Sequence, residues 1–397
     1  MAFTVANALR GDAPRDVLRR GTIIGIIAFL TLIDLFGSQA LLPRLVALYG
    51  VDAATMGFAV NASTIGMAVS GLTVAWFSDR IDRKKGIWVS LALLSVPTLC
   101  LAFTRDASVF MALRIAQGVF MAAAFTLTMT YLSETCSKTA AAGAMAAYIT
   151  GNVASNLFGR LMAASLADWV GVSGSFIGFA VLNLLGAFIA FRYLCPTLPP
   201  PAPIRVSPLK AWAEHMRSAQ LRAAFFIGFL LLFVFVGVFT YVNLELVGPR
   251  LALDPVYLGL VYFVFLPSLF TTPVAGSVAA RYGARPVFWA ASIATCAGLA
   301  MALSASLSVV LLGLAIAGAG TFFAQAAATG YVGRTARANH AAANGLYLTS
   351  YYLGGLIGSI VLGQVYTAFG WTVCVAVLLG AMLLAALIAI ALAERRD

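Results

Sequence analysis

Charged residues are scarce in this chain of 397 residues, because Asp, Glu, Lys and Arg together make up only 10% of it. Soluble globular domains carry about 25% charged residues. The apolar share is 62% and the mean hydropathy is +0.96. A disordered chain would instead have few apolar residues and a high charge. The composition therefore excludes both a soluble globule and a disordered chain.

Histidine and cysteine are also rare, with two and five residues. No two cysteines have CxxC spacing, so neither a disulfide framework nor a zinc site is predicted. The sequence has no P-loop, which excludes ATP as the direct energy source. No histidine lies near a nucleophile within an apolar run. We therefore predict no cofactor, no metal and no catalytic site, and a protein that is not an enzyme.

Long apolar runs fill most of the chain instead. A helix that crosses the hydrocarbon core needs about 20 apolar residues. Uninterrupted runs of that length indicate helices, because barrel strands alternate over about ten residues. The predicted fold is an all-α integral membrane protein with twelve transmembrane helices. The spans are 22–43, 55–78, 87–104, 109–132, 141–163, 173–194, 223–246, 255–279, 286–304, 308–331, 342–366 and 371–392.

Lysine and arginine predict the orientation, because cytoplasmic loops of membrane proteins are rich in both. With a cytoplasmic N-terminus, twenty of the 25 basic residues fall in inside segments. Three fall outside (Arg44, Arg105 and Arg250), and Arg114 and Arg160 lie within spans. The net charge of +11 is therefore a topology signal and does not indicate nucleic-acid binding. We expect a multi-pass membrane protein with both termini cytoplasmic.

The chain divides into two related parts. Residues 195–222 contain six prolines and are predicted to be a cytoplasmic linker between six-helix bundles at 1–194 and 223–397. Two pairs of residues repeat at an offset of 199, namely Tyr148 with Tyr347 and Gly159 with Gly358. Repeated halves around a central site are typical of transporters that alternate access by rocking.

Two short motifs resemble the major facilitator superfamily. Residues 75–87 read AWFSDRIDRKKGI and resemble its loop signature GxLxDRxGRRxxL, with Ala75 and Asp82 in place of the two glycines. Residues 114–118 read RIAQG and resemble its RxxQG motif. The segments that begin at Tyr148 and Tyr347 resemble the YnfM-like branch, near the drug:proton antiporters. The resemblance implies two pseudo-symmetric six-helix bundles and rocker-switch transport.

Ionisable residues within the spans are candidates for function, because charge is costly in the membrane. Asp34 lies about the middle of the first span, and we predict that it carries the coupled proton. Burial and a nearby arginine act on a carboxyl group in opposite directions. A motion that changes the distance from Asp34 to Arg114 would therefore load and release a proton. The alternative is a static charge pair that joins the first and fourth spans.

Polar residues in several spans are predicted to line the substrate cavity. In the fifth span, Tyr148, Asn152, Asn156 and Arg160 recur at i+4 steps and form one stripe. Gln117 lies on the same face as Arg114. In the second half the candidates are Tyr241, Asn243, Glu245, Tyr262, Gln325, Tyr347, Tyr351 and Tyr352. The alternatives are interhelical hydrogen bonding for the stripe and packing or interfacial positions for the tyrosines.

Charged residues at the cytoplasmic ends of the second and eighth spans are predicted to form a gate between the halves. They are Asp79, Arg80, Arg83, Arg281 and Arg285. Charge-assisted hydrogen bonds among them would lock the inner side and break as the halves rock. The alternative is that they only anchor the protein at the cytoplasmic surface.

We therefore expect a secondary active transporter of the bacterial cytoplasmic (inner) membrane that exports a small organic solute in exchange for protons. One alternative is an organic-anion or metabolite transporter or facilitator that uses Arg114 and Arg160. Another is a membrane sensor with a transporter fold that moves nothing. The expected partners are membrane lipid, a small-molecule substrate and protons, with no nucleic acid, and the expected state is a monomer.

Overall fold

The computed structural model describes residues 14–77, 81–135, 138–196, 208–254, 257–336 and 340–392, and these ranges contain helices and no strand. The first half holds α2 (Pro14–Ala40), α3 (Leu42–Tyr49), α4 (Ala53–Asn61), α5 (Ser63–Phe77), α6 (Arg83–Leu101), α7 (Ala107–Thr135) and α8 (Lys138–Tyr193). Then come α9 (Pro208–Arg217), α10 (Ala219–Val247), α11 (Leu258–Val261), η3 (Tyr262–Phe265), α12 (Leu266–Thr271), η4 (Thr272–Val274), α13 (Ala275–Tyr282), α14 (Ala284–Met301), α15 (Leu307–Thr335), α16 (His340–Ile388) and η5 (Ala389–Ala391).

These helices make the twelve predicted passes within the described ranges. Eight helices are long and apolar enough to cross a membrane. Two of them, α8 and α16, each hold two spans, because the chain turns back at Gly171 (φ 76°) and Gly370 (φ 78°). An eleventh pass is α4 with α5, which follows α3 after a bend of 119°. The twelfth runs from α11 to α13, so the prediction of twelve spans is confirmed.

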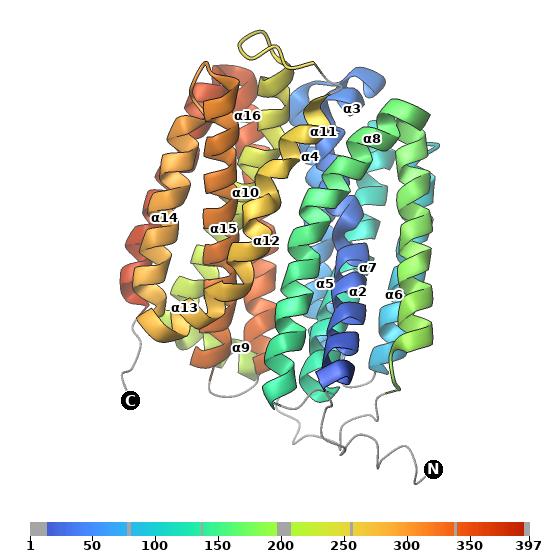
Figure 1. The fold of residues 1–397 in the computed structure, drawn as a ribbon, viewed down its shortest axis with the longest axis vertical. Helices are drawn as coiled ribbons and strands as arrows, with labels where there is room; N and C mark the ends of the chain where they lie inside the picture. The colour runs from blue at the N-terminus through green and yellow to red at the C-terminus, as the bar shows by residue number, and fades with distance from the viewer. Residues whose placement is uncertain are drawn as a thin grey trace.

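The pass from α11 to α13 is the least regular. It contains two short 3-10 segments, Tyr262–Phe265 and Thr272–Val274. Pro267 and Pro273 lie in α12 and η4. Proline has no N–H to donate and its ring clashes with the preceding turn, which breaks a continuous helix. This pass therefore curves alongside α8, as Figure 1 shows.

The two halves use the same helix packing. In the first half α2 packs on α8, and in the second α10 packs on α16. A Cβ atom on Gly159 would lie 2.5 Å from the carbonyl oxygen of Ile33, and one on Gly358 would lie 2.7 Å from that of Phe233. The glycine pair predicted from the offset of 199 therefore marks equivalent close contacts.

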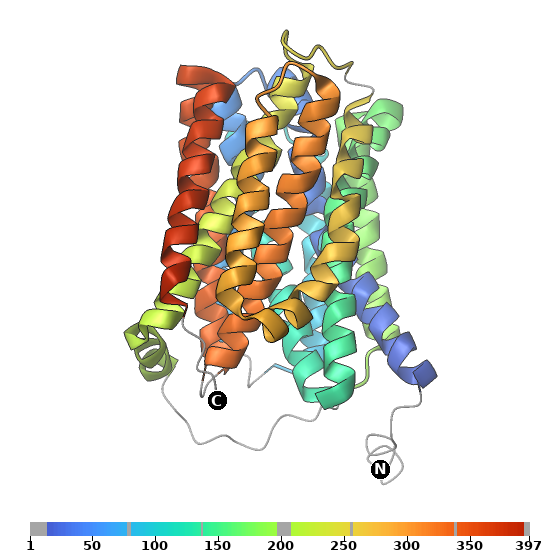
Figure 2. The ribbon, with the colours of Figure 1, turned by 60° about the vertical axis from the view of Figure 1, so that its left-hand side comes forward.

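The halves lie side by side, and the described chain begins and ends at the same end of the bundle (Figures 1 and 2). Helix α9 lies at this terminal end too, beside the start of α10 (Figure 2). The predicted linker 195–222 contains α9 and the first turn of α10, and its residues 197–207 lie outside the described ranges. The short helix α3 and the turns at Gly171 and Gly370 lie at the opposite end, which we call the far end.

Candidate functional site

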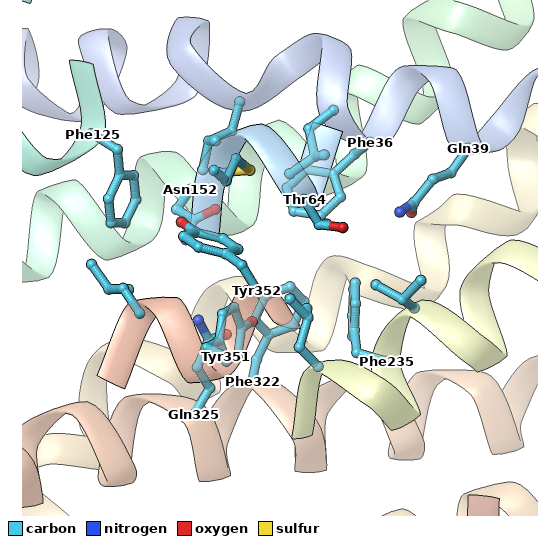
Figure 3. A pocket seen from close by; sticks show the side chains of 16 residues that line it. Phe36, Gln39, Thr64, Phe125, Asn152, Phe235, Phe322, Gln325, Tyr351 and Tyr352 are labelled. Carbon is cyan, nitrogen blue, oxygen red and sulfur yellow. The ribbon is translucent and has the colours of Figure 1, made fainter. Parts of the chain in front are cut away.

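A narrow cavity of about 40 Å³, measured as the space open to water-sized molecules, lies between the two halves. Figure 3 shows the side chains of one half facing those of the other across it. The labelled residues that line it are Phe36, Gln39, Thr64, Phe125 and Asn152 from the first half, and Phe235, Phe322, Gln325, Tyr351 and Tyr352 from the second. About 10–15 Å³ of such space suffices for one water molecule, so the cavity holds a few waters. Ligand pockets have volumes of about 300–1,000 Å³. A small organic molecule would therefore fit between these side chains only after the halves move apart.

The cavity wall is aromatic and carries no charged side chain among the residues that line it. Its hydrogen-bonding groups are three side-chain amides (Gln39, Asn152 and Gln325), two tyrosine hydroxyls and one threonine hydroxyl. Aromatic rings offer large apolar surfaces with preferred edge and face geometries. The wall can therefore pack an uncharged, partly aromatic molecule and orient it through amide groups.

Asp34 does not line this cavity but lies inside the first half, where it is fully buried. Its Oδ2 atom accepts hydrogen bonds from Thr98 Oγ1 (3.0 Å), Gln117 Nε2 (3.0 Å) and Asn183 Nδ2 (3.2 Å). These donors come from α6, α7 and the second part of α8. Four passes of the first half therefore meet at one carboxylate, and we call these four residues the Asp34 cluster.

Arg114 is fully buried beside this cluster. It donates to the carbonyl oxygen of Val60 (2.9 Å), to Ser63 Oγ (3.1 Å) and to Gln117 Oε1 (2.6 Å). Its contact with Asp34 is to the backbone carbonyl, at 3.4 Å. Within the described ranges the two side chains form no direct ion pair. Gln117 instead links them by donating to the carboxylate and accepting from the guanidinium. The sequence analysis predicted that Gln117 lines the cavity, which it does not, and it did not single out Thr98 or Asn183.

Arg160 is also fully buried, and it joins the two halves. Its Nε donates to Asn156 Oδ1 (2.9 Å) and its Nη2 to Gln39 Oε1, both in the first half. Its Nη1 donates to the carbonyl oxygen of Phe239 (3.0 Å) in α10. Four aromatic rings surround the guanidinium at 5.2–5.8 Å, namely Phe36, Phe239, Tyr262 and Phe265. Arg160 therefore extends from α8 into the second half.

Further hydrogen bonds continue this contact between the halves. Gln39 Nε2 donates to Asn61 Oδ1 (2.7 Å), and Asn61 Nδ2 donates to Thr240 Oγ1 (3.2 Å). Asn243 Nδ2 donates to the carbonyl oxygen of Gln39 (3.2 Å), and the Tyr262 hydroxyl donates to Asn243 Oδ1 (2.7 Å). We call this network the far-end closure, because Arg160 is eleven residues from the turn at Gly171.

Three tyrosines that were predicted to line the cavity do not line it and pack against neighbouring residues instead. The Tyr148 hydroxyl donates to the carbonyl oxygen of Phe125 (3.2 Å), and the two rings lie 4.9 Å apart. The Tyr347 ring stacks on Tyr351 with 6.1 Å between ring centres. The Tyr241 hydroxyl donates to the carbonyl oxygen of Ser359 (2.7 Å). Of the predicted cavity residues, those that line it are Asn152, Gln325, Tyr351 and Tyr352.

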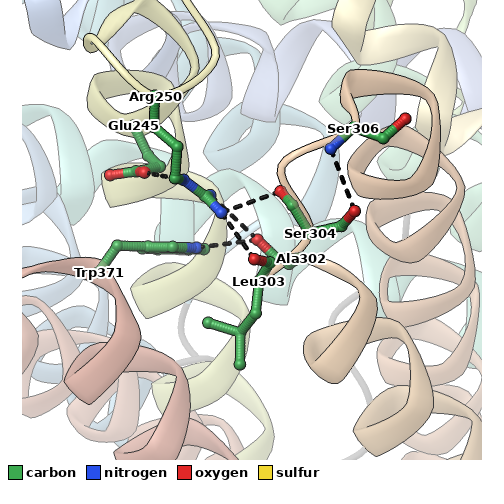
Figure 4. A network of polar contacts seen from close by, with 7 residues as sticks. All are labelled: Glu245, Arg250, Ala302, Leu303, Ser304, Ser306 and Trp371. Atoms are coloured by element: carbon green, nitrogen blue, oxygen red, sulfur yellow. Dashed lines mark hydrogen bonds and ion pairs between the residues drawn. The ribbon is translucent and has the colours of Figure 1, made fainter.

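Glu245 lies away from the cavity, near the far end of the second half. It forms an ion pair with Arg250, which also donates to the carbonyl oxygens of Ala302, Leu303 and Ser304 (Figure 4). Those three carbonyls belong to the connection that follows α14, which ends at Met301. Glu245 and Arg250 therefore fasten two connections of the second half together, outside the predicted substrate site.

The predicted gate at the terminal end is only partly described. Asp79 and Arg80 lie outside the described residues. Arg83 is buried and donates to the carbonyl oxygen of Ile81 (3.1 Å), while Arg285 donates to that of Ile390 (2.6 Å). The Arg281 guanidinium lies over the ring of Tyr282, at 5.3 Å. These contacts each stay within one half, so a lock between the halves stays a prediction.

The sequence profile of the Major Facilitator Superfamily matches residues 24–266 and 250–397. The inner membrane transport protein YnfM of Escherichia coli (strain K12) is 28% identical over 372 residues, which are 90% of this chain and 88% of that protein. The uncharacterized MFS-type transporter YybF of Bacillus subtilis (strain 168) is 29% identical over 291 residues, covering 73% of this chain and 72% of YybF.

Solved structures share the fold at low identity. The nucleoside transporter NupG matches with a TM-score of 0.75 and 15% identity, over 94% of this chain and all of NupG. A bacterial homologue of the human lysosomal transporter Spinster, in an inward-facing and unoccupied conformation, matches with a TM-score of 0.73 and 14% identity. That match covers 96% of this chain and 95% of the homologue. At such identities the likeness concerns the fold alone.

Proposed function

This chain belongs to the major facilitator superfamily, and from that premise we propose that it exports a small, uncharged organic molecule in exchange for protons. The family makes it a multi-pass secondary transporter and not an enzyme. The cargo, the direction and the coupling ion are our proposals. The observation that carries the proposal is the uncharged aromatic cavity between the halves, with a buried carboxylate beside it in one half.

The lining of the cavity supports an uncharged cargo. Six of its side chains are aromatic (Phe36, Phe125, Phe235, Phe322, Tyr351 and Tyr352). Arg114 and Arg160 donate their hydrogen bonds to protein oxygens and do not belong to the lining. An anionic cargo would leave its charge without a partner in an aromatic cavity, and an unpaired buried charge is very costly. The alternative of an organic anion bound by the two arginines is therefore less well supported.

Proton coupling is supported by the position of Asp34. Among the described residues of the first half, Asp34 is the one acidic side chain that is buried. Gln117 connects its carboxylate to Arg114. Taking up a proton would weaken the hydrogen bonds that three donors make to it, because bonds to an ionised group are the stronger ones. The four passes of the cluster would then shift relative to one another, and that shift is our proposed link between proton uptake and rocking.

Export is the proposed direction, because the segments that begin at Tyr148 and Tyr347 resemble the YnfM-like branch, near the drug:proton antiporters. With both termini in the cytoplasm, the far-end closure separates the cavity from the outside. The gate residues Asp79, Arg80, Arg83, Arg281 and Arg285 would then close the cytoplasmic side in the opposite state. We expect a monomer, because one chain supplies both the cavity and the Asp34 cluster.

The test is transport by purified protein in liposomes, with the uncharged aromatic dye phenylnaphthylamine as the probe. We expect a pH step to drive dye accumulation by the wild-type protein. Asp34→Asn should abolish that accumulation and leave exchange of dye between equal pools intact. Asp168→Asn is the matched control, because Asp168 pairs with Arg44 at the surface of the same half. Accumulation by Asp34→Asn at the wild-type rate would refute the coupling role, and a panel of anions that outcompetes the dye would refute the cargo class.

A further inference from the structure

Two buried oxygen atoms in the Asp34 cluster accept no hydrogen bond in the described part of the chain. They are Asp34 Oδ1 and Asn183 Oδ1. Both residues are fully buried, and nearly all buried polar groups in native proteins have a partner. Two such oxygens on side chains that already touch each other therefore need a physical explanation.

The contact between these side chains is half of a larger arrangement. Asn183 Nδ2 donates to Asp34 Oδ2 at 3.2 Å and to Thr98 Oγ1 at 3.1 Å. The orientation of the amide is fixed by chemistry, because only its NH2 group can donate to a carboxylate oxygen. An amide and a carboxylic acid form a closed ring when the N–H bonds one carboxyl oxygen and the acid O–H bonds the amide oxygen. Here the bond from the amide N–H to the carboxyl group is present. The two oxygens that would share the acid proton, Asp34 Oδ1 and Asn183 Oδ1, have no donor among the residues that the structure describes.

We propose that Asn183 is the positioning residue for the coupled proton, which resides on Asp34 Oδ1 and is donated to Asn183 Oδ1. This inference rests on the proposed role of Asp34 as proton carrier. In the loading step a proton from water forms an O–H bond with Oδ1, and the carboxylate becomes a neutral acid. In the release step that O–H bond breaks and the proton returns to water. The cluster thus offers hydrogen bonds to both protonation states of Asp34.

The remaining neighbours of the carboxyl group fit this assignment. Thr98 and Gln117 are neutral and bond Oδ2, which leaves Oδ1 open for the proton. Among the described residues, Arg114 is the one charged group that acts on the Asp34 carboxylate. It is held by Val60, Ser63 and Gln117, so it can stay in place while the proton comes and goes.

The test is infrared difference spectroscopy of the full-length protein in liposomes, with a step from alkaline to acid pH and no ligand. We expect a carbonyl band of a protonated carboxylic acid in the wild-type protein, and its loss in Asp34→Asn. In Asn183→Leu the band should move to higher frequency, because the acid O–H loses its acceptor. Asn152→Leu is the matched control, an asparagine of the same long helix that lines the cavity, and should leave the band in place.

A second variant tests the pairing in the opposite sense. Asn183→Asp places two carboxyl groups at one site, and these cannot both ionise. The midpoint pH of the acid band should therefore rise by about one unit or more. Isotope labelling of the asparagine amides in the wild-type protein gives a third readout, because the Asn183 carbonyl band should shift in the same pH step. This readout stands even if a variant fails to fold.

The outcomes separate this inference from the proposed function. An Asp34 band that keeps its frequency in Asn183→Leu, or an Asn183 carbonyl that does not respond to pH, would overturn the role of Asn183 alone. Release of the proton by sodium at constant pH would also overturn it, since the two oxygens would then bind a cation. Absence of any Asp34 band in the wild-type protein would instead refute proton coupling itself.

Discussion

Replacing Arg160 with methionine should open the far-end closure. In the closed arrangement Arg160→Met leaves two buried side-chain acceptors without a donor, Asn156 Oδ1 and Gln39 Oε1, whereas the Phe239 carbonyl oxygen still accepts from Asn243 Nδ2. When the halves separate at that end, water can reach both. Each unpaired acceptor costs about 1 kcal/mol or more. The closed state therefore loses about 2 kcal/mol relative to the open state, which is a factor of about 30 in their ratio.

Two other contributions act in opposite directions. The closed state also loses contacts of the guanidinium with the rings of Phe239, Tyr262 and Phe265, and such contacts are worth about 2 kcal/mol each at a desolvated site. Removal of the charge relieves the cost of burying it, which amounts to several kcal/mol before pairing. Because these two contributions oppose each other, we keep the cost of the two unpaired acceptors, about 2 kcal/mol, as the net loss of the closed state. A closed-to-open ratio of about 100 would fall to about 3.

The assay is a distance measurement between spin labels at the far end, one on each half. Leu48 in α3 and Tyr257 before α11 are exposed and suit labelling through cysteine, in a chain whose native cysteines are replaced. We expect a single short-distance population in the otherwise unaltered chain and a second, longer-distance population in Arg160→Met.

The matched control is Arg44→Met. Arg44 lies at the same end, but its ion pair with Asp168 joins two helices of one half. Loss of that pair should leave the ratio of the two populations unchanged. If Arg160→Met gives the same distance distribution as Arg44→Met, then the far-end contacts of Arg160 do not stabilise closure and the reasoning fails.

Three smaller predictions concern packing, pH and the far-end loops. In Gly151→Ala the new Cβ would lie 2.1 Å from the Gly25 carbonyl oxygen, so we expect a loss of about 1–3 kcal/mol in thermal unfolding, whereas Gly276→Ala, with open space around it, should unfold like the wild type. Hydrogen bonds from the Thr55 hydroxyl and amide lower the pKa of Asp52, so its stabilisation exists above the usual carboxyl pKa and disappears as the pH falls through the lowered value. Asp52→Ala should therefore cost about 1 kcal/mol at neutral pH and almost nothing in strong acid, measured by unfolding at both pH values. Glu245→Gln breaks the pair with Arg250 and should lower the unfolding temperature without slowing dye transport; slower transport would mean that Glu245 lies on the substrate path.

The fold could be predicted from the sequence because a bilayer imposes a length on every span. The predicted spans 342–366 and 371–392 even place the last turn correctly, because Gly370, where the chain turns back, lies between them. The irregular pass from α11 to α13 was predicted as one ordinary span, 255–279. Hydropathy reports which residues are apolar, and it carries no information on the 3-10 segments that two prolines introduce there.

The cavity was harder to predict than the fold. Residues at i+4 steps share a helix face, but the twelve steps from Tyr148 to Arg160 cover about 18 Å of helix. One end of that stripe packs against Phe125, its middle reaches the cavity through Asn152, and its other end crosses into the second half. The sequence thus predicted correctly which face of the helix turns inward. It could not predict which level of that face meets the cavity, because this depends on how the other half packs against it.

The two arginines within the spans show the same limit. Both looked alike in the sequence, each a cation in an apolar run with no adjacent acid. Arg114 is held by three oxygens of its own half and acts on Asp34, whereas Arg160 is held partly by the other half. A cation whose partners all move with it keeps its environment when the halves rock, and one whose partners are divided must lose some of them. Arg114 is therefore suited to a proton site that works in both states, and Arg160 to the contact that distinguishes one state from the other.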